Sequence, residues 1–257
     1  MPPIDIADVD DPRLEPYRDV KDRDLTGRHG VFMAEGKVVL ERLFVSPVAV
    51  CINMLTTSER LKTLDISGLV DKVPIYVVPQ AVMDAVAGFP IHRGYLALGR
   101  YVPKQSLTDV LTKPKVRVLA LSAIANTDNM GGLMRNAAAF GVDAVILDAE
   151  CCDPLYRKAI RVSVGGVLKV PHYRVDDLVA TFREYDLTAY ALSPSGQITL
   201  DAIVPPVRSA FVFGAEGPGL RQEVMAACES VRIDMHGGFD SLNVATTSGI
   251  VLYHMCR

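Results

Sequence analysis

The chain has 257 residues, of which 49% are hydrophobic and 22% are charged, and its formal net charge at pH 7 is −3. This composition is typical of a globular protein with a sizeable core, and it excludes disordered, collagen-like and coiled-coil classes. No apolar run approaches the roughly 18 to 20 residues of a membrane helix, and the acidic N-terminus lacks the apolar core of a signal peptide. We therefore expect a cytoplasmic protein without a membrane partner.

The five cysteines form no Cys-x-x-Cys pair, and two of them, Cys151 and Cys152, are adjacent. Zinc sites and disulfide frameworks need spaced cysteines that can reach one another in the fold. The sequence therefore predicts neither a disulfide framework nor a metal site.

Residues 1–101 read as a small α/β domain, because short apolar runs alternate with a helical pattern. Its charged opening fits a short helix that ends near Gly27. The other predicted elements are strands at Val31–Met33, Val48–Met54, Ile75–Val78 and Tyr95–Gly99 and a helix at Lys37–Phe44. Residues 102–115 are polar and contain two prolines, so we interpret them as a linker.

Residues 116–257 show a clearer alternation of apolar strands and helices, which predicts a parallel sheet covered on both faces. Ligands of such sheets bind at the carboxyl ends of the strands. The predicted strands are Val116–Leu121, Ala144–Leu147, Leu187–Ala191, Ala210–Phe213 and Val231–Asp234. The predicted helices are Gly131–Phe140, Leu155–Val164, Val175–Tyr185, Leu220–Cys228 and Leu242–Met255.

A basic segment lies within this second block. From Pro154 to Val175 there are five basic residues and no acidic one: Arg157, Lys158, Arg161, Lys169 and Arg174. A local positive patch can hold phosphates whatever the total charge of the molecule. The alternative is a solvated surface whose counter-ions come from elsewhere in the fold.

The first of three unusual clusters opens a predicted helix. Asn126–Asn129 are all favourable N-cap residues. Gly131 and Gly132 then fall in the first turns, where each costs roughly 1 kcal/mol against alanine. Arg135 lies four and three residues later, on the same helical face. It is a candidate for a pocket, with an arginine that reaches the solvent as the alternative.

The second cluster, Phe211–Leu220, reads as a strand, a glycine-rich turn and a helix start. Its glycines spell neither GxGxxG nor a phosphate-binding loop, and Pro218 removes an amide donor. Glu216 could accept hydrogen bonds from a ribose or fix the turn, but taken alone the cluster is better explained as a plain strand-to-helix connection.

The third cluster, Ile233–Tyr253, combines a glycine-containing loop with small polar residues inside an apolar stretch. We expect Ser241 to be the N-cap of the closing helix, and His236 to be a loop residue rather than a ligand. The small polar residues indicate close packing or a lined cavity.

In this order and spacing, the three clusters resemble the SpoU/TrmH branch of the SPOUT RNA methyltransferases. The first motif of that family, with an asparagine, a glycine and an arginine, is matched by Asn129, Gly131 and Arg135. The second, Gly-x-Glu-Gly-x-Gly, is matched by Gly214–Gly219, and the third, Ser-Leu-Asn-Val, by Ser241–Val244.

The resemblance covers residues 116–257 and includes the arginine-serine-glycine segment of the family at Arg161, Ser163 and Gly165. The chain departs from the family at Asn126–Thr127, where Asp-Pro is usual. Residues 1–101 look like the RNA-binding domain that many of these enzymes carry ahead of the catalytic one.

The resemblance implies a Rossmann-like catalytic domain with a deep C-terminal trefoil knot, an exception to the rule that chains are not knotted. It also implies S-adenosylmethionine as methyl donor, a ribose 2′-hydroxyl of RNA as acceptor, and a homodimer through the catalytic domain. The cofactor-binding residues that it implies are Leu192, Gly214, Ala215, Glu216, Gly217, Ile233, Met235, Leu242, Asn243 and Ala245.

The family assigns catalysis to Arg135. A guanidinium with a pKa above about 12 is a poor base, so we favour stabilisation of the developing alkoxide by its charge. Asn129, Ser241 and Asn243 would orient the arginine, the ribose and the cofactor loop, and Glu216 would fix the second loop. The expected RNA-binding residues are Arg157, Lys158, Arg161, Arg18, Lys21 and Arg23.

Three rival interpretations remain at this point. A tRNA substrate is possible, but a full N-terminal domain favours ribosomal RNA. A catalytically idle RNA-binding protein is the second, and the intact Arg135, Glu216 and Asn243 argue against it. The third is a nicotinamide oxidoreductase, which the missing GxGxxG disfavours.

Overall fold

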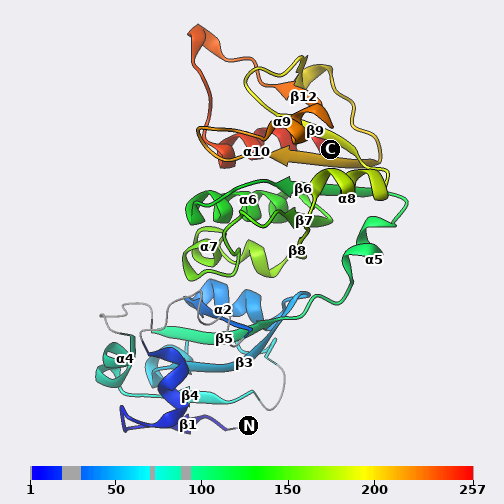
Figure 1. The fold of residues 1–257 in the computed structure, drawn as a ribbon. Coiled ribbons are helices and arrows are strands. Elements are labelled where there is room, and N and C mark those ends of the chain that lie inside the picture. Colours follow the sequence, from blue (N-terminus) through cyan, green and yellow to red (C-terminus); the bar gives the residue numbers. More distant parts are fainter. Residues whose placement is uncertain (1, 19–29, 70–72, 88–93, 257) are drawn as a thin grey trace. The chain divides into compact units, whose positions relative to one another are not determined.

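The computed structural model describes residues 2–18, 30–69, 73–87 and 94–256. They form two compact units, one made of residues 1–104 and 155–169 and the other of residues 105–154 and 170–257 (Figure 1). No helix in these described ranges is long and apolar enough to cross a membrane, and they contain no group of three or more His, Cys, Asp or Glu side chains that could hold a metal ion.

The first unit is built on a five-stranded mixed sheet with the order β1-β4-β3-β5-β2. Its core is formed by apolar side chains from the sheet and from two helices, including Leu14, Leu55 and Met83. The strands are β1 (Ile4–Asp5), β2 (Val31–Glu35), β3 (Ala49–Thr56), β4 (Ile75–Val77) and β5 (Tyr95–Tyr101). The helices are η1 (Pro12–Tyr17), α2 (Lys37–Phe44), α3 (Ser58–Leu61) and α4 (Gln80–Ala87).

The segment Leu155–Lys169 belongs to this first unit, whereas the sequence-based boundary placed it in the second. It contains α7 (Arg157–Val162) and the short η2 (Gly166–Leu168). The hydroxyl of Ser46 donates a hydrogen bond of 2.6 Å to the carbonyl of Leu168, and α7 packs against β2.

The second unit is a seven-stranded sheet with the order β10-β12-β9-β11-β6-β7-β8, in which each pair of neighbouring strands is parallel. The predicted parallel sheet is therefore confirmed. Its strands are β6 (Val116–Leu121), β7 (Ala144–Leu147), β8 (His172–Arg174), β9 (Thr188–Leu192), β10 (Ile198–Thr199), β11 (Arg208–Phe213) and β12 (Glu229–Arg232). Its helices are α5 (Leu107–Leu111), α6 (Thr127–Phe140), α8 (Leu178–Glu184), α9 (Gln222–Ala226) and α10 (Val244–Met255), with 3-10 turns η3 (Leu200–Ala202) and η4 (His236–Gly238).

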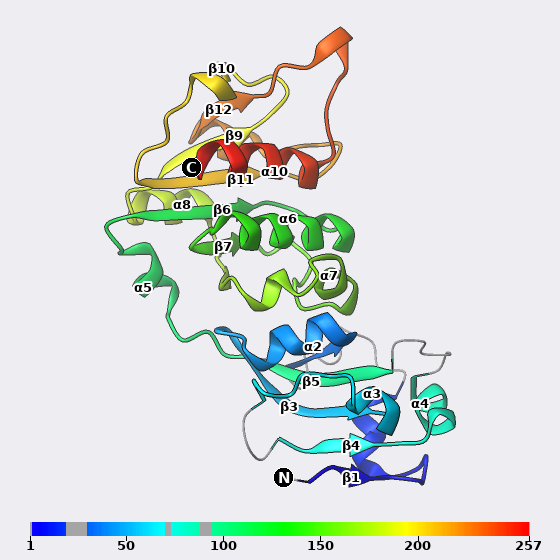
Figure 2. The ribbon, with the colours of Figure 1, turned by 180° about the vertical axis from the view of Figure 1, so that it is seen from behind.

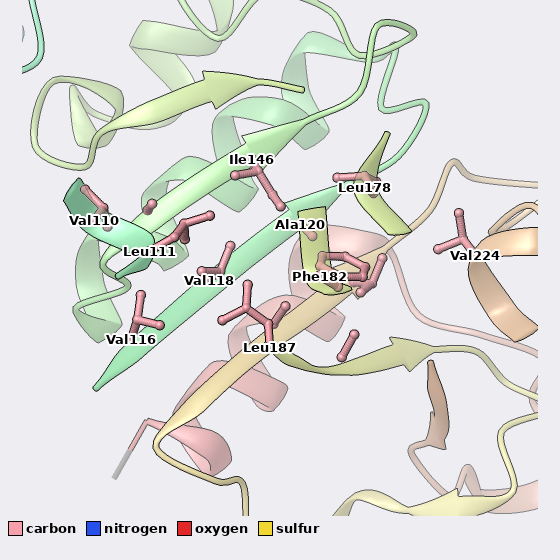
Figure 3. Packing of buried hydrophobic residues seen from close by; sticks show 14 residues of the cluster. Val110, Leu111, Val116, Val118, Ala120, Ile146, Leu178, Phe182, Leu187 and Val224 are labelled. Atoms are coloured by element: carbon pink, nitrogen blue, oxygen red, sulfur yellow. The ribbon is translucent and has the colours of Figure 1, made fainter. Parts of the chain in front are cut away.

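Successive side chains of a strand point to opposite sides, so a buried sheet has two apolar faces. Helices cover both faces of this sheet. On one face, Val116, Val118 and Ala120 of β6 pack with residues of α5, α8 and α9 (Figure 3). On the other face lie α6 and α10, which contact one another (Figure 2).

The expected linker contains a helix of the second unit. Ser106 caps α5 through a capping box with Asp109, and both Val110 and Leu111 are fully buried. The Arg208 guanidinium donates a hydrogen bond of 2.8 Å to the Leu111 carbonyl at the end of this helix. A five-residue helix gives too weak a periodic signal to be recognised in a polar, proline-containing stretch.

Candidate active site

A cavity of about 480 Å³ opens at the carboxyl ends of β9, β11 and β12, beside the start of α10. Its size is typical of small-molecule sites. The wall combines backbone of glycine-rich loops with apolar side chains and a few polar ones. The lining residues are Leu192, Ser193, Pro194, Phe213, Gly214, Ala215, Glu216, Gly217, Gly219, Val231, Ile233, Met235, Ser241, Leu242, Asn243, Val244 and Thr247.

Asn243 connects the three motifs at this cavity. Its side-chain amide donates a hydrogen bond of 2.9 Å to Asn129 Oδ1 in the first motif and one of 2.8 Å to Glu216 Oε1 in the second. Its side-chain oxygen accepts hydrogen bonds from the backbone N–H groups of Ala245 and Thr246. Asn243 is therefore the N-cap of α10, and the prediction that Ser241 caps this helix was wrong. Asparagine is at least as good a cap as serine, and its amide offers donors that a hydroxyl lacks.

The first motif begins at the N-terminus of α6. Asn126 is the N-cap, because its side-chain oxygen accepts hydrogen bonds from the N–H groups of Asp128 and Asn129. Asn126 therefore fills the capping role that an aspartate can also fill. Asn129 is buried. It lies in the first turn of α6, where its side-chain oxygen accepts the hydrogen bond from Asn243.

Gly132 of α6 allows close packing of two helices. A Cβ atom on Gly132 would lie 2.5 Å from the Cβ of Ala245 in α10, far inside van der Waals contact. One turn further, the Asn136 amide donates hydrogen bonds of 2.7 Å to the Ala245 carbonyl and 2.8 Å to the Ser248 hydroxyl. These contacts fix α6, and the arginine that it carries, against α10.

The second motif forms a tight loop at the end of β11. A Cβ atom on Gly214 would lie 2.6 Å from backbone atoms of Gly219 and Leu220, so only glycine fits there. Gly219 closes the loop by donating its N–H to the carbonyl of Ala215.

The expected cofactor-binding residues line the cavity with the exception of Ala245, which packs against α6 instead. Ser241, Glu216 and Asn243 also line the cavity, and Asn129 reaches it through Asn243. Arg135 is exposed on α6 and is absent from the lining. The cofactor-binding residues expected from the sequence did not include the strand-end residues Ser193, Pro194, Phe213 and Val231 or the helix residue Thr247. The rule that ligands bind at strand ends could have indicated the first group.

Four of the six expected RNA-binding residues are described, and all four fall in the first unit: Arg18, Arg157, Lys158 and Arg161. Arg161 forms an ion pair with Glu35 of β2 at 3.7 Å, so this part of the basic segment has an acidic partner from elsewhere in the unit. Arg18 pairs with Asp10 at 3.2 Å and also donates to the Val9 carbonyl. Lys158 is exposed and Arg157 is half-buried. Lys21 and Arg23 lie outside the described residues.

Comparison with known proteins identifies the class. Residues 116–253 match the model of the SpoU rRNA Methylase family. Over 98% of its length the chain is 37% identical to an uncharacterized tRNA/rRNA methyltransferase of Mycobacterium tuberculosis, of which it covers 91%. Over 68% of its length it is 32% identical to the 23S rRNA (guanosine-2′-O-)-methyltransferase RlmB of Acinetobacter baylyi, of which it covers 75%.

Solved structures agree on the fold. An rRNA methyltransferase from Sinorhizobium meliloti superposes with a TM-score of 0.81 at 20% identity, over 98% of this chain and 96% of that one. An AdoMet-bound rRNA methyltransferase from Sinorhizobium meliloti gives a TM-score of 0.79 at 21% identity, over 98% of this chain and 96% of that one. The chain therefore belongs to the SpoU rRNA methylase family, and it is an RNA methyltransferase.

Proposed function

We propose that this protein transfers a methyl group from S-adenosylmethionine to a ribose 2′-hydroxyl of ribosomal RNA. The observation that carries the proposal is the Asn243 amide, which joins the first and second motifs at the wall of the cavity. The three motifs of the family thus meet at one cavity, although they are far apart in the sequence.

The cavity fits the cofactor in size and chemistry. Leu192, Met235 and Leu242 offer an apolar wall for a flat ring, and Glu216 offers a carboxylate at the same cavity. Backbone groups of the second-motif loop, Gly214–Gly219, would complete the binding. When bound, S-adenosylmethionine supplies an electrophilic methyl group on a sulfonium.

The residues of this chain align the acceptor and stabilise its charge. Arg135 places a permanent positive charge where the ribose oxygen becomes negative, which lowers the energy of the transition state. Asn129 and Asn243 hold the first motif against the second, and Glu216 is fixed by Asn243. Ser241, at the same wall, is positioned to orient the ribose.

The exposed position of Arg135 supports a homodimer formed through the catalytic unit. Arg135 does not line the cavity of its own chain, and on the adjoining α10 two large apolar side chains are exposed, Ile250 and Tyr253. Tyr253 also makes an edge contact with Phe140 at the end of α6. A second copy on this surface would cover the apolar side chains and bring Arg135 to a subunit boundary. Family membership further supports a deep trefoil knot in the C-terminal segments.

The first unit is proposed to select the RNA, and a complete N-terminal unit favours ribosomal RNA over tRNA.

The decisive experiment supplies the purified protein and labelled S-adenosylmethionine with either 23S ribosomal RNA or tRNA transcripts. Nucleosides are then identified by mass spectrometry. We expect a 2′-O-methylated nucleoside in the ribosomal RNA. A methylated base would contradict ribose methylation, and label confined to tRNA would contradict the substrate.

A further inference from the structure

A buried carboxylate lies outside the cavity, directly after β7. The side chain of Asp148 is 4% exposed. Its oxygens accept hydrogen bonds from the Ser122 hydroxyl at 2.7 Å and from the N–H groups of Ala123, Glu150 and Cys151, each at 3.1 Å. Burial alone would raise the pKa of Asp148, but these hydrogen bonds hold it below its ordinary value. The group is therefore ionised at neutral pH.

Two of these donors belong to the turn between β6 and α6, residues 122–126, which leads into the first motif. Ala123 has a φ of +55°, a left-handed conformation that is uncommon for a residue with a side chain. Its N–H points to both carboxylate oxygens, at 3.1 Å each. Asp148 thus holds this turn in a conformation that the local sequence does not favour.

The partner of Asp148 lies just beyond the second motif. Arg221 lies two residues after the second-motif loop and is the N-cap residue of α9. Its Nη2 lies 3.3 Å from Asp148 Oδ2. Since β11, β6 and β7 are neighbours in the sheet, Arg221 reaches from the end of β11 past β6 to the end of β7.

Arg221 is poorly suited to bind an RNA phosphate. Besides Asp148, its guanidinium lies 3.7 Å from Glu150 and 3.6 Å from Glu223. Three carboxylates around one guanidinium give this cluster a net negative charge, which repels a phosphate. The charge of Arg221 serves contacts within the protein.

We propose that Asp148 and Arg221 are positioning residues that hold the first-motif turn and the second-motif loop in a fixed relation. The proposal rests on the proposed function, because it assigns these loops to one active site. Asn243 fixes the second-motif loop through Glu216, in its middle, and Arg221 fixes its far end. Arg221 thus adds an ion pair to a loop that its own backbone hydrogen bond from Gly219 to Ala215 also closes.

The test compares Arg221→Gln with Arg183→Gln. Arg183 is exposed on α8 and lines the same surface hollow as Arg221 and Asp148, so its loss removes the same charge from the same hollow. Hydrogen exchange of the amides of Gly214–Leu220 is measured in the free protein, together with the Kd and KM for S-adenosylmethionine and kcat.

For Arg221→Gln we expect exchange in this loop to rise about tenfold and the Kd and KM for S-adenosylmethionine to rise about tenfold, with kcat within about twofold. Arg183→Gln should change none of these. Arg221→Lys keeps a charge of shorter reach and should restore part of the protection. Equal exchange in the two glutamine variants would overturn the proposal.

A double-mutant cycle with Asp148→Asn separates positioning from general stability. If Arg221 acts through Asp148, its replacement in the Asp148→Asn background should have little further effect on loop exchange. Additive effects would overturn the pairing. A wild-type protein that fails to methylate RNA would contradict the proposed function. Hydrogen exchange of the loop needs no cofactor, so it still tests the roles of Asp148 and Arg221 in that case.

Discussion

At the scale of single residues, Asn243 combines two roles that can be separated by one substitution. Asn243→Asp keeps an oxygen that caps α10, because aspartate caps as well as asparagine. It removes the donor to Asn129 and sets a second carboxylate against Glu216, whose Oε1 now lies 2.8 Å from the amide nitrogen. We expect the free energy of unfolding to fall by about 1.5–3 kcal/mol, as for the loss of a hydrogen bond to a charged group, and the affinity for S-adenosylmethionine to weaken roughly 10- to 100-fold because the second-motif loop is no longer held. Calorimetry and thermal unfolding measure the two effects.

The control for this substitution is Asn243→Ala, which loses the cap as well. Loss of the cap should lower its free energy of unfolding by about 1 kcal/mol in addition to the loss of the bridge. Equal affinity of Asn243→Asp and the wild type would show that the bridge between the motifs is dispensable.

Arg135 gives the second prediction at this scale. Arg135→Ala should cut the rate of methyl transfer by about a hundredfold or more, as expected for a preorganised charge in the transition state. Folding and cofactor affinity should stay nearly intact, because the side chain is exposed and does not line the cavity. Single-turnover kinetics and calorimetry check the two halves. Near-normal turnover would remove Arg135 from the mechanism.

At the scale of elements, the contact of α6 with α10 predicts different effects on stability for alanine substitutions at Gly132 and at Gly249. In Gly132→Ala the new Cβ would meet Ala245 at 2.5 Å, and overpacking of this kind costs typically 1–3 kcal/mol. The gain in helix propensity, about 1 kcal/mol, does not offset a cost in the upper part of this range. We expect a lower midpoint of urea unfolding and slower methyl transfer, since α6 carries Arg135.

Gly249→Ala is the matched control in the same pair of helices. Its Cβ would lie 3.4 Å from Asn136 Nδ2, which is ordinary contact. This variant should be as stable as the wild type or more stable, by up to about 1 kcal/mol. A Gly132→Ala protein of equal stability would argue against the close approach of the helices.

The elements also show how far the sequence could predict the fold. The strands Val116–Leu121 and Ala144–Leu147 and the helix Lys37–Phe44 have the predicted bounds, because each has a strong apolar pattern and clear polar flanks. The strand β8 (His172–Arg174) was missed, since it is short and lies within the basic segment. Helix α4 (Gln80–Ala87) was missed because only Gln80 and Asp84 mark its polar side in an otherwise apolar or small-residue stretch.

The candidate site was less accessible from the sequence. The motifs identified the second-motif loop and the third motif, and their residues do line the cavity. The roles of Asp148 and Arg221 could not be predicted, because each lies outside the motifs and they meet only when β11 and β7 lie in one sheet. Likewise the partner of Arg161 is Glu35, far away in the sequence.

At the scale of the whole molecule, the proposed homodimer depends on the exposed apolar side chains of α10. Ile250 and Tyr253 are 39% and 51% exposed. Replacing both with lysine should shift sedimentation toward the monomer and abolish methyl transfer. Val204→Lys, at a side chain that is 91% exposed, is the control and should leave both unchanged. A fully active monomer would contradict the proposed dimer.

The stability of the whole molecule should fall in acid through His172. Burial lowers the pKa of this histidine from 6.5 to about 3 in the folded state. Between these two values the unfolded chain binds a proton that the folded chain does not, so stability is complete above pH 6.5 and is lost as the pH falls toward 3. Urea unfolding at several pH values should show a contribution of up to about 1.4 kcal/mol per pH unit. His172→Gln should remove this contribution, and an unchanged slope in that variant would assign the acid sensitivity to other groups.

The hydrogen bond between Asn243 and Asn129 has a consequence for the folding of the chain. Asn129 lies 114 residues away from Asn243 along the chain, and contacts between such distant positions carry a large loop-closure cost, which slows their formation. The Asn243 side chain caps α10, the last helix, and also lines the cavity. Docking of α10 therefore completes the site. We therefore expect a newly made chain to transfer methyl groups only after this helix has docked, so that the onset of methyl transfer reports its docking.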